Sequence, residues 1–294
     1  MPKYIKADQF FYPHGVRRGG FLELVDGKVV DGKFGKHVDQ VSDGAEVIDY
    51  SGYSIAPGLV DTHIHGFGGV DVMDNNIEGT LHTMSEGLLS TGVTSFLPTT
   101  LTSSYEQLLA VTENIGARYQ EASGAKIRGI YFEGPYFTEE FKGAQNPAYM
   151  KDPRMDEFRA WQKAANGLLN KIALAPEREG VEDFVRTVTG EGVTVALGHS
   201  NATFDQAKKA VDAGASVWVH AYNGMRGLTH RELGMVGAMY ELPHTYAELI
   251  CDGHHVDPKA CDILLKQKGT ENIALITDCM TAGGLQDGDY MLGE

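Results

Sequence analysis

Short apolar runs alternate with longer amphipathic stretches along most of this chain. From about residue 55 onward the apolar runs are typical of buried strands, and they cover residues 55–60, 93–99, 127–133, 172–175, 193–197, 216–219, 246–251 and 273–277. Stretches with a helical pattern separate most of them, at about residues 77–90, 105–121, 155–169, 181–189, 203–213 and 258–266. This alternation predicts repeated βαβ units and a parallel sheet.

Two α/β architectures fit such units, a (β/α)8 TIM-like barrel and a doubly wound open sheet. Polar residues that could act in a site follow the predicted strands: His63, His65, Glu133, His199, His220, Asp252 and Asp278. A barrel builds its site at this face from many strands, whereas an open sheet gathers its ligands at one switch point. The sequence therefore predicts a barrel, over residues 56–294.

Residues 1–55 follow a different pattern, rich in Gly, Asp and Val. Two β-prone runs, residues 21–25 and 28–30, flank the dipeptide Asp26-Gly27. Asp-Gly between two such runs favours a tight hairpin turn. We therefore expect a small antiparallel β domain ahead of the barrel.

Composition and charge narrow the class of protein. The net charge of -15 argues against general nucleic-acid or membrane binding, because no basic stripe is present to attract phosphates or headgroups. The three cysteines form no Cys-x-x-Cys pair, a pattern that suits buried thiols in a reducing compartment. The first ten residues carry charges where a signal peptide is apolar, and no apolar run approaches ~18 residues. We expect a cytoplasmic protein.

Histidines and one glutamate at the strand ends suggest a metal site. His63 and His65 are two apart in a predicted strand, so their imidazoles project to the same side. Alone, this pair is more often two ordinary histidines than a metal site. Together with Glu133, His199 and His220 it forms a set of nitrogen and carboxylate ligands that suits Zn²⁺ or Fe²⁺ with an activated water.

Asp278 follows the last predicted strand, at the same face as these ligands. A carboxylate beside an activated water can take its proton and pass it to a leaving group. The alternative is a helix N-cap or a turn residue, which is common for Asp. We favour the catalytic interpretation because the strands around it carry the candidate ligands.

The order of these motifs resembles the amidohydrolase superfamily and, within it, the family of N-acetylglucosamine-6-phosphate deacetylases. The resemblance runs from about Gly52 to Asp278, and its motifs are His63-x-His65, Glu133-Gly134-Pro135, Gly198-His199-Ser200, His220-Ala221-Tyr222-Asn223-Gly224-Met225, Asp252-Gly253-His254-His255 and Thr277-Asp278. A glutamate after the third strand is the most distinctive feature. The resemblance implies hydrolysis of the N-acetyl group of N-acetylglucosamine 6-phosphate to glucosamine 6-phosphate and acetate.

The resemblance also implies roles for the site residues. Glu133, His199 and His220 are the expected principal metal ligands. His63 and His65 hold a second ion or support the first, so one or two divalent metal ions, zinc or iron, are expected in each subunit. Asp278 matches the catalytic acid and base.

For the substrate, the resemblance implies that Asn223 and Gly224 meet the phosphate through backbone N–H groups and that His255 binds nearby. Arg231 lies in the one compact basic cluster near the barrel mouth and is expected to pair with the phosphate. The planar guanidinium group of arginine can bind a phosphate through two N–H groups at once. In the family this arginine reaches across from a neighbouring subunit, which implies a homodimer. Its alternative is a solvated loop charge.

One segment departs from the family pattern. The family carries a histidine in a Gly-x-His-Asn-Pro segment that stabilises the developing oxyanion, but here Ala144 is followed by Gln145. Gln145 can donate a hydrogen bond but carries no positive charge. We expect Ala144 and Gln145 to contact the substrate.

The resemblance makes residues 1–55 part of a small β-sandwich-type domain, which we expect to be incomplete because the chain ends soon after the eighth strand. Two other functions stay open. The chain could be another metal-dependent amidohydrolase, acting on a cyclic amide or on an acetylated galactosamine phosphate. It could also be a non-catalytic barrel that binds a sugar phosphate.

Overall fold

The computed structural model describes residues 3–13, 15–25, 28–29, 36–74 and 77–292. It divides into two compact units, Met1–Gly58 and Leu59–Glu294. Each unit is described by itself below. That these units are the two domains expected from the sequence stays a prediction.

The described strands of the first unit form one six-stranded sheet. The strands are β1 (Lys3–Tyr12), β2 (Gly15–Arg18), β3 (Phe21–Val25), β4 (Lys28–Val29), β5 (Lys36–Val38) and β6 (Glu46–Ile55). Strands β3 and β4 pair antiparallel as the hairpin pattern predicts, although its turn, Asp26-Gly27, lies outside the described residues. Ala7, Phe10 and Leu22 form the small core of this sheet.

The prediction of purely antiparallel pairing in this unit is wrong, because β1 and β6 run parallel. The connection that follows β5 returns the chain to the start of β1, so β6 runs in the same direction as β1. Two ion pairs cross this pairing, Lys3 with Glu46 at 2.8 Å and Lys6 with Asp49 at 3.1 Å. Turn patterns in the sequence carry no signal for such a return.

The second unit is a nearly closed barrel of parallel strands. In sheet order these are β7 (Leu59–Ile64), β10 (Val93–Thr100) with the short β11 (Lys126–Ile127) at its side, β12 (Ile130–Tyr136), β13 (Leu169–Leu174), β14 (Thr194–Leu197), β15 (Val217–Trp218), β16 (Tyr246–Ile250) and β17 (Ile273–Ile276). A bridge between Ile64 and Cys279 brings the last strand back to the first. The TIM-like barrel predicted from the sequence is confirmed.

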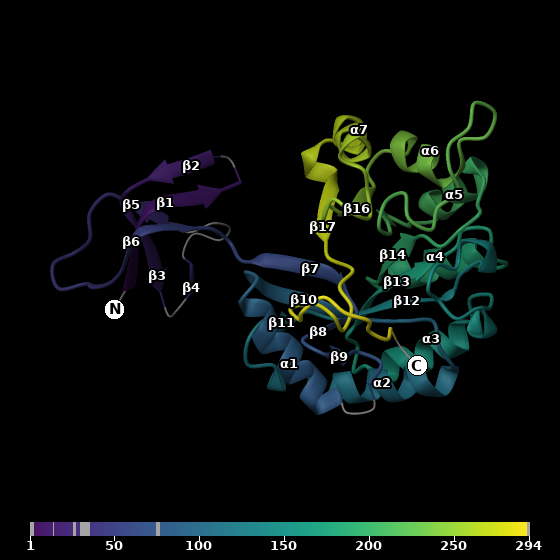
Figure 1. Cartoon of the computed structure of the whole chain (residues 1–294), viewed down its shortest axis with the longest axis horizontal. Helices are drawn as coiled ribbons and strands as arrows, with labels where there is room; N and C mark the ends of the chain where they lie inside the picture. Colours follow the sequence, from purple (N-terminus) through teal and green to yellow (C-terminus); the bar gives the residue numbers. More distant parts are fainter. Residues whose placement is uncertain (1–2, 14, 26–27, 30–35, 75–76, 293–294) are drawn as a thin grey trace. The chain divides into compact units, whose positions relative to one another are not determined.

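Helices follow most of the strands and cover the outside of the barrel. They are α1 (Ile77–Leu89), α2 (Tyr105–Arg118), α3 (Met155–Ala164), α4 (Val181–Gly190), α5 (Phe204–Asp212), α6 (Gly234–Glu241) and α7 (Pro258–Lys268). Short 3-10 turns add η1 (Tyr119–Glu121), η2 (Glu139–Phe141), η3 (Pro147–Tyr149) and η4 (Thr270–Asn272). Figure 1 shows α1, α2 and α3 next to one another along the strands that they follow.

Alternation along each strand separates the outer core from the barrel interior. In β12, Phe132 points outward and packs against Trp161 of α3, while its neighbours Tyr131 and Glu133 face inward. Tyr131 packs inside with small residues such as Ala173 and Ala196, all fully buried. Glu133, at the top of this interior layer, is thereby aimed at the C-terminal mouth of the barrel.

Two further findings concern the helices and the cysteines. No helix in the described part of the chain is both long and apolar enough to span a bilayer. The three cysteines are free, but the prediction that all are buried is wrong, because Cys251 is exposed at the end of β16.

Candidate metal centre

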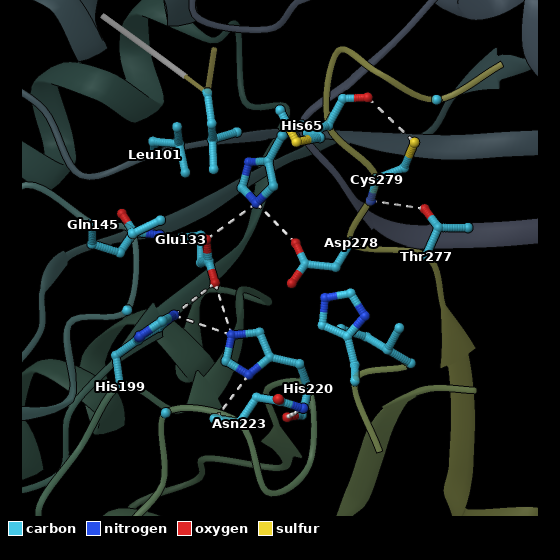
Figure 2. A pocket seen from close by; sticks show the side chains of 18 residues that line it. His65, Leu101, Glu133, Gln145, His199, His220, Asn223, Thr277, Asp278 and Cys279 are labelled. Atoms are coloured by element: carbon cyan, nitrogen blue, oxygen red, sulfur yellow. Dashed lines mark hydrogen bonds and ion pairs between the residues drawn. The ribbon is translucent and has the colours of Figure 1, made fainter. Parts of the chain in front are cut away.

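The C-terminal ends of the barrel strands surround a cavity of about 640 Å³. Its walls include ten of the residues proposed from the sequence: His65, Glu133, Ala144, Gln145, His199, His220, Asn223, Gly224, His255 and Asp278. Figure 2 shows the side chains of His65, Glu133, His199, His220 and Asp278 turned toward one another. His63 lies directly behind this wall and is fully buried.

Glu133, His199 and His220 form the first candidate ligand group. The Nε2 atoms of His199 and His220 are 3.1 Å apart and lie 3.1 and 3.2 Å from Oε1 of Glu133. Each ring uses Nδ1 to donate to a backbone carbonyl, that of Phe141 at 2.9 Å and that of Asn223 at 3.0 Å. A carbonyl only accepts, so the proton sits on Nδ1 and both Nε2 lone pairs face the centre.

His63, His65 and Glu133 form the second group, so Glu133 is common to both. The Nε2 atoms of the two histidines are 3.2 Å apart, and His65 Nε2 lies 3.2 Å from Oε2 of Glu133. Nδ1 of His65 donates to the carbonyl of Thr99 at 3.1 Å. Oδ1 of Asp278 lies 3.2 Å from Nε2 of both histidines.

This arrangement fits a metal ion better than it fits a bare protein. Two lone pairs and a carboxylate oxygen about 3.1 Å apart repel one another unless a cation stands between them. Ligand bonds of ~2.0–2.1 Å in tetrahedral geometry place neighbouring donor atoms about 3.3 Å apart, close to the spacings in both groups. Imidazole nitrogen with carboxylate oxygen is a donor set that zinc and iron accept.

The charges of the cluster support the same conclusion. Burial lowers the pKa of His63, but Asp278 and Glu133 outweigh it and raise that pKa to about 10. Burial likewise opposes the hydrogen bonds that His65 makes to these carboxylates, and the pKa of His65 is raised to about 9. For Asp278, burial acts upward and the charge of His63 downward, and the net pKa lies below its ordinary value. The two carboxylates therefore stabilise positive charge on these histidines, as they would stabilise the charge of a metal ion.

Three of the site residues have a backbone conformation that L-residues seldom adopt. The φ angles of His199, His220 and Asp278 are 45°, 26° and 51°. Each residue stands where a strand ends and the chain turns over the barrel mouth. Such conformations cost about 1–3 kcal/mol each and cluster at functional sites.

The side-chain amide of Gln145, expected to contact the substrate, is already hydrogen-bonded at both ends within the protein. Its Nε2 donates to Oε2 of Glu133 at 2.5 Å, and its Oε1 accepts from the backbone N–H of Thr102 at 2.7 Å. The side chain lines the cavity but is only 4% exposed. One amide hydrogen is thus committed to Glu133, which leaves the second for a substrate.

The two residues predicted to meet a phosphate differ in availability. The backbone N–H of Asn223 already donates to the carbonyl of His220 at 3.0 Å, whereas that of Gly224 has no hydrogen-bond partner among the described residues. Gly224 has a φ of 61°, and an added Cβ would stand 3.0 Å from Nδ1 of His199. Only glycine fits there without moving the histidine.

Two other predicted residues lie farther out. His255 borders the cavity with an exposed side chain, and its Nδ1 faces Oδ2 of Asp252 at 2.7 Å. Arg231 is exposed, does not line the cavity of its own chain, and has no ion-pair partner in the part of the chain that the structure describes. The structure therefore brings every predicted site residue except Arg231 to the cavity or its immediate wall.

Several contributors were not predicted from the sequence. Glu177 accepts hydrogen bonds from the hydroxyls of Thr138 and Ser200, both at 2.6 Å, and so holds the loop that carries His199. Lys171 and Glu248 lie inside the barrel below the centre, 4% and 2% exposed. Lys171 and Glu248 are charged residues within otherwise apolar strands, and this feature of the sequence could have identified them.

Comparison with known proteins agrees with the fold and shows the family. The family described as the amidohydrolase family matches residues 54–285. The chain therefore belongs to the amidohydrolase family.

Its similarity extends to individual members. An N-acetylglucosamine-6-phosphate deacetylase of Vibrio furnissii is 43% identical over 251 residues, which are 85% of this chain and 62% of that protein. An N-acetylgalactosamine-6-phosphate deacetylase of Escherichia coli O157:H7 is 43% identical over 239 residues, 81% of this chain and 63% of that protein. The chain thus spans less than two thirds of the length of these two relatives.

A solved structure is also similar throughout. A variant of N-acetyl-D-glucosamine-6-phosphate deacetylase from Mycobacterium smegmatis, in complex with N-acetyl-D-glucosamine 6-phosphate, superposes with a TM-score of 0.87 at 30% identity. The match covers 99% of this chain and 74% of that one. Both units of the present chain therefore have counterparts in that structure.

Proposed function

We propose that this protein is a metal-dependent hydrolase that removes the N-acetyl group of N-acetylglucosamine 6-phosphate. The observation that carries the proposal is the carboxylate of Asp278, 3.2 Å from the Nε2 atoms of His63 and His65 at the wall of the cavity. A module that only binds a sugar phosphate has no need for a carboxylate beside a cluster of metal ligands. The relatives named above support the choice of substrate.

We propose Glu133, His199 and His220 as ligands of one ion, with His63 and His65 as ligands of a second. One or two zinc or iron ions per chain are proposed. When bound, such an ion polarises the acetamide carbonyl and lowers the pKa of a water molecule. The shared position of Glu133 between the groups supports two ions rather than one.

Asp278 is the proposed general base and then general acid. Its pKa lies below the ordinary range, so it is ionised at neutral pH and free to take the proton of the attacking water. It then returns the proton to the amine, without which an amide anion would have to leave. Gln145 is proposed to offer its second amide hydrogen to the carbonyl oxygen as charge develops there.

The phosphate is proposed to bind at the outer part of the cavity. Gly224, whose backbone N–H has no partner among the described residues, and the side chain of His255 line the cavity, as do Asn223 and Ala144. Arg231 is proposed to reach the phosphate from a second copy of the chain, since it does not line its own cavity. This implies a homodimer, and we propose that it works in the cytoplasm.

The epimer of the sugar is the main alternative. The Escherichia coli relative that is named for N-acetylgalactosamine 6-phosphate is as identical to this chain as the Vibrio protein. The two substrates differ only in the orientation of one hydroxyl group. N-acetylgalactosamine 6-phosphate is therefore the second candidate substrate.

A panel of substrates tests the proposal. We expect acetate release from N-acetylglucosamine 6-phosphate to exceed that from its galactosamine epimer and from unphosphorylated N-acetylglucosamine. Arg231→Gln should raise KM for the phosphorylated sugar by about tenfold or more, because a charge-assisted contact of about 1.5–3 kcal/mol is lost. Faster acetate release from the galactosamine epimer would make that sugar the substrate. Equal release from the unphosphorylated sugar would refute the proposal that Arg231 binds the phosphate.

A further inference from the structure

One of the four cluster histidines differs from the others in what its Nδ1 atom faces. Nδ1 of His65, His199 and His220 each donates to a backbone carbonyl, which directs Nε2 into the centre. Nδ1 of His63 has no hydrogen-bond partner among the described residues, although the side chain is fully buried. A buried donor without a partner costs about 1–3 kcal/mol and calls for an explanation.

The nearest anionic atom to this nitrogen is Oε2 of Glu248, at 3.8 Å. That oxygen is itself buried and accepts no hydrogen bond from the part of the chain that the structure describes. A donor and an acceptor that both lack partners therefore face each other, about 0.6–1 Å beyond the usual N–H···O length. A small rotation of either side chain closes this gap.

Two groups, the hydroxyl of Thr62 and the ammonium of Lys171, hold the carboxylate of Glu248 in this position. Its Oε1 accepts from the hydroxyl of Thr62 at 2.7 Å and from Nζ of Lys171. Lys171 is fixed in turn, because Nζ also donates to the carbonyl of Thr62 at 3.3 Å and lies 3.7 Å from the centre of the Tyr131 ring. With Oε1 engaged by these donors, Oε2 is left for His63.

We propose that Glu248 is a positioning residue for His63, accepting its Nδ1 proton so that Nε2 is presented to the second ion. This inference rests on the proposed metal-dependent function. Histidines that bind metals usually donate their other ring nitrogen to such a partner, which fixes the tautomer and strengthens the ligand. Lys171 supplies the positive charge without which a carboxylate would not remain ionised inside the barrel.

Glu248→Gln tests the role with little change in shape. Lys171 and Thr62 are both donors to Oε1, so the amide oxygen takes that place and the amide NH₂ turns toward His63. Two donors then face each other, which drives the histidine proton to Nε2 and blocks the metal. We expect the affinity for the second Zn²⁺ to fall by about 10–100-fold while that for the first is unchanged.

The measurement is a titration of metal-free protein with Zn²⁺ against a competing chelator, together with metal content by elemental analysis. Glu157→Gln is the matched control. Glu157 lies in α3 and also pairs with a lysine, Lys151 at 2.8 Å, but it does not line the cavity. If Glu248→Gln fails to fold, the double variant Lys171→Met, Glu248→Leu removes both charges, a change that buried pairs often tolerate. It should show the same selective loss.

The results separate this inference from the proposed function. Unchanged binding of both ions in the Glu248 variants, or a wild-type protein that binds fewer than two ions, would overturn the role of Glu248. Acetate release by the wild type is measured in parallel. If the wild type binds two ions and the variants lose only the second, but no acetate is released, the role of Glu248 is supported and the deacetylase function is refuted. If acetate is released but the variants bind both ions normally, the deacetylase function is supported and the role of Glu248 is refuted.

Discussion

At the residue scale, Gln145 is a single side chain that connects a backbone segment to a proposed metal ligand, Glu133. Its amide joins the backbone of Thr102 to Oε2 of Glu133, so it sets which oxygen of the glutamate faces each ligand group. The positions of Glu133 and the histidines could be predicted, because they follow apolar strands. The partners of their outward nitrogens could not, since Phe141 and Thr99 contribute only backbone carbonyls, which any residue would supply.

Gln145→Ala should therefore weaken metal binding as well as stability. Removing the amide leaves the N–H of Thr102 and an oxygen of Glu133 without partners, a cost of about 1–3 kcal/mol in the free energy of unfolding. Gln162→Ala is the matched control. The Gln162 amide also makes two hydrogen bonds, to the backbone carbonyl and from the backbone N–H of Leu169, but Gln162 lies in α3 and not at the cavity. Urea unfolding should show both losses, and elemental analysis should show lost metal only for Gln145→Ala. Normal metal content in that variant would contradict its bridging role.

At the scale of elements, the strands were more predictable than the segments between them. Each apolar strand run in the barrel coincides with an observed strand. Most of these strands are buried on both faces, which leaves a continuous apolar signal, although Leu59, Val60 and Leu275 are exposed. Helix α6 was missed because it is buried on nearly all sides and carries two glycines, so no polar face marks its period. The predicted helix at residues 155–169 ends early, since Gly167, with a φ of 81°, turns the chain into β13.

The segment that follows His65 forms a short hairpin that no pattern in the sequence predicted. Gly66–Phe67 and Val70–Asp71 form a two-stranded hairpin, β8 and β9. Gly68 and Gly69 make its turn, with φ angles of 65° and 91°. Positive φ at both central residues is the type I′ pattern that suits tight hairpins. The glycines were visible in the sequence, but the flanking strands are too short to show a period.

Asp61 joins the two ends of the barrel. Its Oδ2 accepts from the hydroxyl of Thr277 at 2.5 Å and its Oδ1 from the backbone N–H of His63 at 3.2 Å. Strands β7 and β17 share no continuous ladder among the described residues, so the hydrogen bond from Thr277 to Asp61 supplements the bridge between Ile64 and Cys279. The position of His63 relative to Asp278 depends on this closure.

Asp61→Ala is expected to lower the free energy of unfolding by about 2–3 kcal/mol, because buried donors lose a charged acceptor. Urea unfolding measures the loss. Asp49→Ala serves as control, since Asp49 accepts from Ser51 and pairs with Lys6 at an exposed site, and its loss should cost under about 1 kcal/mol. A loss for Asp61→Ala no larger than for this control would mean that the barrel closes without the carboxylate.

At the scale of the whole molecule, the metal centre draws on five strands that are distant in sequence. Its proposed ligands come from the ends of β7, β12, β14 and β15, and Asp278 follows β17. An ion at this point therefore binds only the folded barrel and stabilises it by mass action. A chain of this length shifts in Tm by about 2–4 °C per kcal/mol.

Removal of metal with a chelator should lower Tm by about 5–10 °C, and equimolar Zn²⁺ or Fe²⁺ should restore it. Differential scanning calorimetry measures both steps. Mg²⁺ is the control ion, because a set of imidazole ligands does not suit it. Equal recovery with Mg²⁺, or no change on chelation, would contradict a nitrogen-rich metal centre.

The central claim is that the metal cluster and Asp278 together remove an acetyl group. Acetate release from N-acetylglucosamine 6-phosphate, measured on metal-free and reloaded protein for the wild type and Asp278→Asn, tests it most directly. We predict no release without metal, restored release on reloading the wild type, and a loss of at least about 100-fold in Asp278→Asn with the substrate still bound. Release by the metal-free protein, or by Asp278→Asn at the rate of the wild type, would contradict the account.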